Sequence, residues 1–140
     1  MNATPIVSHI LETSLYVSDL QRSAEFYQEL FGFRLLLQDH RMCALQVPAS
    51  GVLLLFKHDG SLKPSPTPGG IIPPHGGSGA LHLCFAIPLA SLDGWTSHLE
   101  QYGIAVESRV RQHFGGISLY FRDPDGHSLE VATPGLWENY

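Results

Sequence analysis

Three residues whose side chains commonly bind metal ions lie inside short apolar stretches of this 140-residue chain: Glu12, His82 and Glu130. A carboxylate flanked by apolar residues is costly to bury without a partner, and a bound metal ion removes that cost. Two carboxylates and one imidazole suit a divalent first-row ion, such as Mn, Fe, Ni or Zn, and leave coordination positions open for water or a substrate. An alternative without metal places both glutamates on a solvated sheet face and His82 in the interior as a hydrogen-bonded histidine.

A repeated pattern of elements must position these residues. Alternating apolar and polar residues predict strands, and apolar residues at helical spacing followed by glycine predict helices. The order strand, helix and three strands occurs twice. The predicted elements are a strand over 9–17, a helix between Ser18 or Asp19 and Gly32, strands over 33–38, 42–47 and 51–57, a strand over 80–87, a helix over about 89–102 before Gly103, and strands over about 105–110, 117–122 and 128–133.

Glu12 and His82 occupy equivalent places in this repeat, in the first strand of each copy. The more apolar row of each strand should pack against the helix, so Glu12 and His82 should face the other side of the sheet. Glu130 lies in the last strand, between Leu129 and Val131, and should face that side as well. The equivalence therefore favours one metal site over three unrelated residues.

The fold class that follows is α+β, with two βαβββ modules in a single domain over 1–140. Module one spans about 8–58 and module two about 80–134, and an aromatic tail, 135–140, follows. Between the modules lies a Pro- and Gly-rich loop, 60–79, whose composition predicts no regular structure. The loop is either a plain linker or a functional lid. The tail either covers a cleft or a dimer seam, or it frays.

Composition excludes several classes of function. The net charge is −5 and the 8 Lys and Arg residues form no run, so the chain lacks the basic surface that nucleic acids need. No stretch approaches the roughly 20 apolar residues of a membrane-spanning helix, and the first residues do not resemble a signal peptide. Cys43 and Cys84 are expected to be reduced, buried thiols in a cytoplasmic protein.

Two segments carry motifs that are recognisable together. LETSLYVSDLQRSAEFYQELFGF contains a strand residue seven before the Asp of an S-D-L turn, then a helix that ends in L-F-G. GGISLYFRDPDGHSLEVATP contains a D-P-D-G turn followed four residues later by Glu130. Together they resemble the vicinal-oxygen-chelate superfamily, which includes glyoxalase I, extradiol dioxygenases, and fosfomycin- and bleomycin-resistance proteins. The resemblance covers nearly the whole chain and implies that the two modules form a cupped mixed sheet.

The resemblance also implies roles for individual residues. Glu12 matches the first-strand ligand, often His or Gln in relatives, while His82 matches the histidine of module two and Glu130 the terminal glutamate. The fourth ligand of glyoxalase I corresponds to about Leu54, which cannot bind a metal. A three-ligand site is therefore implied, as in dioxygenases and fosfomycin thiol transferases, although those usually have two His and one Glu. Dimeric relatives often complete their sites across chains, so the resemblance implies a homodimer in which Glu12 meets the other two ligands from the same or the partner chain.

Three further residues should share the faces of these ligands. Ser14 and Tyr16 alternate with Glu12 and are candidates for contacts with a substrate, and Tyr120 should lie on the side of Glu130. The resemblance to fosfomycin-resistance proteins implies that the Tyr120 hydroxyl orients the substrate. The alternative is a core tyrosine whose hydroxyl is bonded internally.

Two further charged or titratable residues each have two interpretations. Arg122 either binds an anionic substrate through two hydrogen bonds or pairs with Asp123 or Asp125 of the neighbouring turn. His75, on the loop before the second module, is a candidate acid or base that closes over the metal. A surface histidine without function is the alternative for His75.

Two functions of different class fit these features. In the first, a metal-dependent enzyme binds two oxygens of a small substrate, and lyase, isomerase or ring-cleaving dioxygenase chemistry follows. In the second, a dimer groove sequesters a drug or metabolite without catalysis, as bleomycin-resistance relatives do. The intact triad favours the enzyme, because a sequestering pocket does not require a metal.

Overall fold

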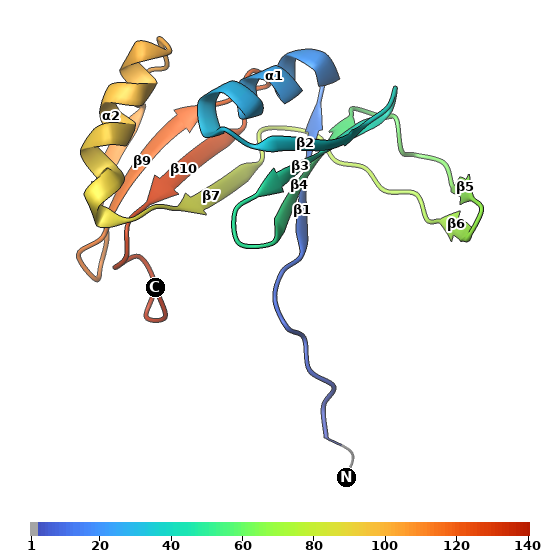
Figure 1. The fold of residues 1–140 in the computed structure, drawn as a ribbon, viewed down its shortest axis with the longest axis horizontal. Coiled ribbons are helices and arrows are strands. Elements are labelled where there is room, and N and C mark those ends of the chain that lie inside the picture. Colours follow the sequence, from blue (N-terminus) through green and yellow to red (C-terminus); the bar gives the residue numbers. More distant parts are fainter. Residues whose placement is uncertain (1–2) are drawn as a thin grey trace.

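The computed structural model describes residues 3–140, which form two modules joined by an arm (Figure 1). Module one consists of β1 (Glu12–Val17), α1 (Leu20–Phe31), β2 (Arg34–Gln38), β3 (Met42–Val47) and β4 (Gly51–Lys57). Module two consists of β7 (His82–Ala86), a 3₁₀ turn (Leu89–Ser91), α2 (Leu92–Gln101), β8 (Ser108–Arg111), β9 (Ile117–Arg122) and β10 (Ser128–Ala132). The arm between them contains β5 (Ser65–Thr67) and β6 (Gly70–Ile72).

Each module has a four-stranded sheet with the same connectivity. The strand orders are β1-β4-β3-β2 in module one and β7-β10-β9-β8 in module two. In both, the first strand pairs in parallel with the last, and the other neighbours are antiparallel. The α+β class and the two βαβββ modules predicted from the repeat are therefore confirmed.

Helix α1 begins and ends where the sequence predicts. The Asp19 side chain accepts a hydrogen bond from the backbone N–H of Arg22 at 3.1 Å, which satisfies one free N–H group of the first turn. Gly32 follows the helix at φ +69°, a left-handed conformation that costs glycine no steric strain, and its N–H bonds the Gln28 carbonyl. These caps fix where the chain turns from β1 into the helix and from the helix toward β2.

One hydrophobic core joins the two modules. The apolar row of each first strand enters it, with Leu15 and Val17 from β1 and Phe85 from β7. Phe31, at the end of α1, packs against Phe85 and against Trp95 of α2, with ring centroids 4.7 and 5.3 Å away. The opposite faces of β1 and β7 lie outside this core and carry Glu12 and His82.

The turn between β9 and β10 bonds module two to module one. Asp123 is buried and accepts a hydrogen bond from the Tyr27 hydroxyl of α1 at 2.8 Å. Asp125 accepts one from the backbone N–H of Ser18, also at 2.8 Å. The D-P-D-G motif thus has a structural role at the junction of the modules.

His127 adds a second connection at the same junction. It is buried, and its Nδ1 lies 2.9 Å from the Leu81 N–H, which can only donate. Nε2 therefore carries the proton and donates to the Tyr16 carbonyl of β1 at 2.7 Å. The imidazole links the beginning of module two to the first strand of module one.

Tyr27 is expected to make the free energy of unfolding fall as the pH rises above 10. Burial, and next the Asp123 carboxylate, raise the pKa of the Tyr27 phenol above its usual value of 10.0. The folded chain keeps this proton where the unfolded chain releases it, so the contribution is complete below pH 10 and declines above it. The decline is about 1.4 kcal/mol per pH unit for this one group.

Urea unfolding measured from about pH 8 to 11 tests this expectation. The Tyr27→Phe variant should lose less stability per pH unit than the wild type above pH 10. Equal pH slopes in the two proteins would show that Tyr27 is not the group responsible.

Two predicted strands begin three residues later in the structure, and the others agree within two residues at each end. The first begins at Glu12 rather than at residue 9, because its partner β4 begins at Gly51; residues 9–11 are exposed. The strand predicted over 105–110 is β8, which begins at Ser108, where its pairing with β9 begins. For β1 the length of the partner strand, rather than local alternation, determines where the strand starts. The length of β9 does not explain the start of β8, because β9 continues past Tyr120 to Arg122.

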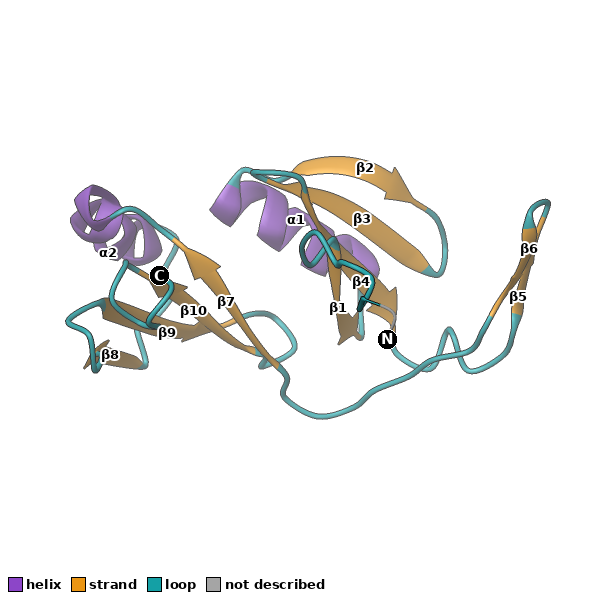
Figure 2. Ribbon diagram, turned by 90° about the horizontal axis from the view of Figure 1, so that it is seen from below, coloured by secondary structure: helices purple, strands orange, loops and turns teal. Residues whose placement is uncertain are grey.

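The Pro- and Gly-rich segment 60–79 is not free of regular structure, contrary to the sequence prediction. Its two short strands pair antiparallel, with Pro66 opposite Ile71. A two-stranded hairpin has free edges, so a proline can occupy one without breaking a needed hydrogen bond. Figure 2 shows the hairpin projecting away from both sheets.

Candidate metal centre

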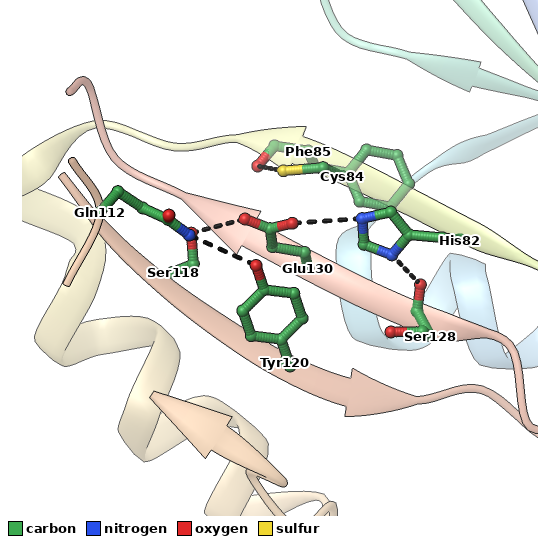
Figure 3. A network of polar contacts seen from close by, with 8 residues as sticks. All are labelled: His82, Cys84, Phe85, Gln112, Ser118, Tyr120, Ser128 and Glu130. Atoms are coloured by element: carbon green, nitrogen blue, oxygen red, sulfur yellow. Dashed lines mark hydrogen bonds and ion pairs between the residues drawn. The ribbon is translucent and has the colours of Figure 1, made fainter. Parts of the chain in front are cut away.

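The parallel pairing of β7 with β10 brings His82 and Glu130 together (Figure 3). In this register Ser128 lies beside His82 and Cys84 beside Glu130, so the two predicted ligands are diagonal neighbours. His82 Nε2 lies 3.2 Å from Glu130 Oε1. The Glu130 side chain is 4% exposed and the His82 side chain is 53% exposed. The pair therefore consists of one buried side chain and one that solvent can reach.

A backbone carbonyl orients the His82 imidazole. Its Nδ1 lies 2.9 Å from the Ser128 carbonyl oxygen, so Nδ1 carries a proton and donates. In the neutral ring Nε2 then has a free lone pair directed toward Glu130, which is the arrangement that metal-binding histidines use. The ring also stacks on Tyr120, with centroids 6.2 Å apart.

A chain of hydrogen bonds holds the Glu130 carboxylate. Ser118 Oγ donates to Glu130 Oε2, and Gln112 Nε2 donates to Ser118 Oγ at 2.8 Å and to the Tyr120 hydroxyl at 3.3 Å. One carboxylate oxygen is therefore bonded inside the protein, while Oε1 faces His82. A carboxylate fixed in this way needs little reorganisation when it binds a ligand.

Tyr120 lies directly opposite Glu130 in the pairing of β9 with β10. Burial and the Glu130 carboxylate raise the pKa of the Tyr120 phenol above its usual range, outweighing its hydrogen bond from Gln112, which acts in the other direction. The hydroxyl therefore stays protonated at neutral pH. It can donate a hydrogen bond to a molecule bound beside the pair.

Ser118, Gln112 and Cys84 belong to this cluster, and the sequence did not single them out as site residues. Alternation could have found two of them, because Ser118 stands two residues before Tyr120 and Cys84 two residues after His82. Gln112 follows β8 and reaches across the turn to β9. No local pattern indicates that contact.

Cys84 is exposed, whereas the sequence predicted that both cysteines are buried; Cys43 is buried as expected. The reason is again the alternation of β7, which places Cys84 on the open face with His82 and turns Phe85 into the core. Desolvation, and next the Glu130 carboxylate, raise the pKa of the Cys84 thiol to about 12. The thiol is therefore neutral at physiological pH.

The third predicted ligand, Glu12, lies in module one and does not meet the other two within this chain. With Ser14 and Tyr16 of β1 it lines a cavity that His75 of the arm also contacts. Within residues 3–140, no three His, Cys, Asp or Glu side chains are close enough together to hold a metal ion. The described residues therefore bring together two of the three predicted ligands, His82 and Glu130.

His75 and Arg122 are each bonded to other residues of the chain. His75 Nδ1 lies 2.8 Å from the Tyr16 hydroxyl, and Tyr16 is four residues along β1 from Glu12, a separation of about 13 Å. Arg122 donates to both carboxylate oxygens of Glu107, at 2.6 and 3.0 Å. The pairing of Arg122 with an aspartate of the turn, one alternative from the sequence, is therefore wrong.

The residues of module two fit a divalent metal ion. An oriented imidazole nitrogen and a carboxylate oxygen converge at 3.2 Å, one on a half-exposed side chain and one on a buried side chain. Nitrogen and oxygen donors of this kind bind Mn, Fe, Ni and Zn. The bonds to Ser128 and Ser118 supply the outer support that such ligands usually have.

Comparison with known proteins identifies the family of the chain. The model of a family described as the Glyoxalase/Bleomycin resistance protein/Dioxygenase superfamily matches residues 6–131. The chain belongs to this superfamily. Its members in that description have different activities, so membership alone does not name the reaction of this chain. Neither helix in residues 3–140 has the length and apolar character needed to cross a membrane.

Relatives within the superfamily differ in activity. The chain is 27% identical to the metallothiol transferase FosB of Bacillus licheniformis, over 94% of this chain and 77% of that protein. It is 28% identical to the catechol-2,3-dioxygenase of Bacillus subtilis, over 89% of this chain but 41% of the dioxygenase. Among solved structures, a lactoylglutathione lyase from Agrobacterium tumefaciens superposes with a TM-score of 0.86 and 34% identity, covering 94% of this chain and 98% of that one.

Proposed function

We propose that this chain is a metal-dependent enzyme acting on a small substrate that chelates the metal through two oxygens, in a lyase, isomerase or ring-cleaving dioxygenase reaction. The observation that carries the proposal is the convergence of His82 Nε2 and Glu130 Oε1 at 3.2 Å. The Ser128 carbonyl orients the imidazole, and the Ser118 hydroxyl orients the carboxylate. A purely structural pair would not need the imidazole at an open face.

Glu12 of the partner subunit is the third ligand in this proposal, supplied by a homodimer. Glu12 is exposed and lies on the open face of module one. Exposed apolar side chains occur on the N-terminal segment and on β2, among them Ile6, Val7, Leu36 and Leu37. Apolar surface of this kind is usually covered by another chain.

The residues around the pair have distinct tasks. Bound there, the metal would act as a Lewis acid that stabilises negative charge on substrate oxygens. Tyr120 donates its phenolic proton in a hydrogen bond and orients a substrate oxygen beside Glu130. His75 and Tyr16, at the far end of β1 from Glu12, contact the distal part of the substrate, so His75 acts as acid or base only on a substrate that extends that far.

Elemental analysis of protein purified without chelator tests the proposal. The wild type should retain roughly one divalent ion per chain, and the Glu130→Ala variant should retain almost none, because the buried oxygen ligand is lost. The Glu100→Ala variant, which removes an exposed carboxylate on α2, should keep the wild-type content. A metal-free wild type that binds ligands tightly would contradict the enzyme and favour a sequestering protein.

The two classes of reaction can be separated with the reconstituted protein. Oxygen uptake with catechols that depends on Fe(II), and not on Mn or Zn, supports a ring-cleaving dioxygenase. Turnover with several divalent ions and without oxygen uptake supports lyase or isomerase chemistry.

A further inference from the structure

A cavity of about 610 Å³ lies on the open face of module one. This volume is within the range of small-molecule sites in enzymes. Strands β1, β3 and β4 form its floor, and the arm contributes Ile72 and His75 to its wall. The cavity begins at Glu12, so it is continuous with the position that we propose for the metal.

The floor of the cavity is apolar and well packed. Ala44, Leu54 and Phe56 are buried and form a small hydrophobic cluster separate from the main core. Leu54 belongs to this floor, at about the position where the resemblance to glyoxalase I implies a fourth ligand. Leucine there removes a possible ligand and adds apolar surface for the body of a substrate.

Arg41 provides a positive charge at one end of this apolar floor. Its guanidinium lies over the Phe56 ring at 5.9 Å, and Nη1 donates to Ser61 Oγ at 2.9 Å. Among residues 3–140, no carboxylate oxygen lies within 4.0 Å of the guanidinium. Asp39, nearby in the chain, directs Oδ1 to the backbone N–H groups of Arg41 and Met42 instead.

An arginine in this position can bind an anion. The guanidinium has five N–H donors in a planar fork that matches a carboxylate, and one of them is bonded to Ser61. The charge is partly removed from water by the cavity wall, where an ion pair is stronger than at an open surface. A bound carboxylate would supply the counter-charge that the described chain does not.

The arm keeps this end of the cavity closed on one side. His75 packs edge-on against Phe56, with centroids 4.4 Å apart, and its backbone N–H bonds the Ser61 carbonyl at 2.9 Å. Gly77 lies so close to the Tyr16 ring that a Cβ atom added to Gly77 would be 2.7 Å from a ring carbon. Arg41 and the arm are therefore held together through Ser61.

The two ends of the cavity differ in charge and are well separated. Glu12 pairs with Val52 and Tyr16 with Phe56 in the β1–β4 register, so four residues, or about 13 Å, separate the Glu12 end from the Arg41 end. A ligand that reaches both ends must be elongated. Its middle lies on Ala44 and Leu54.

From this geometry we infer that the substrate is an elongated organic anion, with a carboxylate bound by Arg41, an apolar body on the floor of module one, and its reacting oxygens at the Glu12 end. The inference rests on the proposed function for the identity of the reacting end. The binding of the carboxylate by Arg41 does not depend on the proposed function, because Arg41 and the floor of the cavity lie in module one alone.

Calorimetric titration of the metal-depleted wild type with decanoate, and with 1-decanol as the uncharged analogue, tests this inference. Decanoate should bind at least tenfold more tightly than decanol. The Arg41→Gln variant should lose this preference and bind both ligands with the affinity of decanol. The Arg34→Gln variant, which removes an exposed arginine of β2 outside the cavity, should retain the wild-type preference.

A second variant tests the place of binding. Ala44→Leu adds volume to the floor of the cavity and should weaken decanoate and decanol alike, with far-ultraviolet circular dichroism confirming that the variant is folded. Equal decanoate affinity in the wild type and Arg41→Gln, or no binding to the wild type, would overturn the inference. The Glu130→Ala variant separates the two proposals, because it should lose metal and still bind decanoate.

Discussion

A mixture of the Glu12→Ala and His82→Ala variants, unfolded and refolded together, is expected to bind metal although neither variant does so alone. Each variant lacks one ligand in both sites of its own dimer. A mixed dimer has one site with all three ligands and one site that lacks two. Statistical pairing makes half of the dimers mixed, so about a quarter of all sites should be restored.

The control for this experiment is a mixture of His82→Ala with Glu130→Ala. These two residues lie on the same protomer 3.2 Å apart, so no pairing of the two variants produces an intact site. Metal content after refolding and dialysis is the measurement. Glu12→Ala protein that holds wild-type metal by itself would remove Glu12 from the ligand set, and a first mixture that stays empty would exclude a site shared between chains.

Replacement of Asp123 by alanine is expected to destabilise the protein by about 3 kcal/mol, a large share of the stability of an ordinary domain. Asp123 is buried and accepts three hydrogen bonds, from the Tyr27 hydroxyl at 2.8 Å and from the backbone N–H groups of Asp125 and His127 at 3.0 and 2.9 Å. Alanine would leave these donors without a partner, and each unsatisfied buried group costs about 1–3 kcal/mol.

Urea unfolding at neutral pH measures this loss. The Asp123→Asn variant keeps one acceptor oxygen and should lose less stability than Asp123→Ala. Glu138→Ala, which removes an exposed carboxylate near the C-terminus, should unfold at the wild-type midpoint. An Asp123→Ala midpoint equal to that of the wild type would show that the turn does not hold the modules together.

Local signals in the sequence predicted most of the fold. Asp19 and Gly32 determine the ends of α1 through contacts within a few residues, so their types alone were sufficient. Alternation placed His82, Tyr120 and Glu130 on the open face of one sheet, since the period of a strand is strict. The repeat then placed Glu12 at the equivalent position of module one.

The remaining features depend on contacts between distant residues. The start of β1 depends on the length of β4, and the bond from Gln112 to Ser118 depends on a turn that follows no simple pattern. The pairing of Arg122 with Glu107 joins β9 to the residue before β8, while the partner that the sequence offered within the chain was an aspartate of the adjacent turn. Composition indicated a loop at 60–79 because Pro and Gly are rare in strands, yet a short hairpin tolerates both.

The hairpin arm has a consequence for how this protein can diversify. Its backbone hydrogen bonds are made mainly within the arm, while Ile72 and His75 are the arm residues among those that line the cavity. The two sheets therefore constrain few arm residues besides Ser61, His75 and Gly77. Exchange of the hairpin between homologues would change the wall of the cavity without changing module two, which offers both evolution and protein engineering a short route to new specificities.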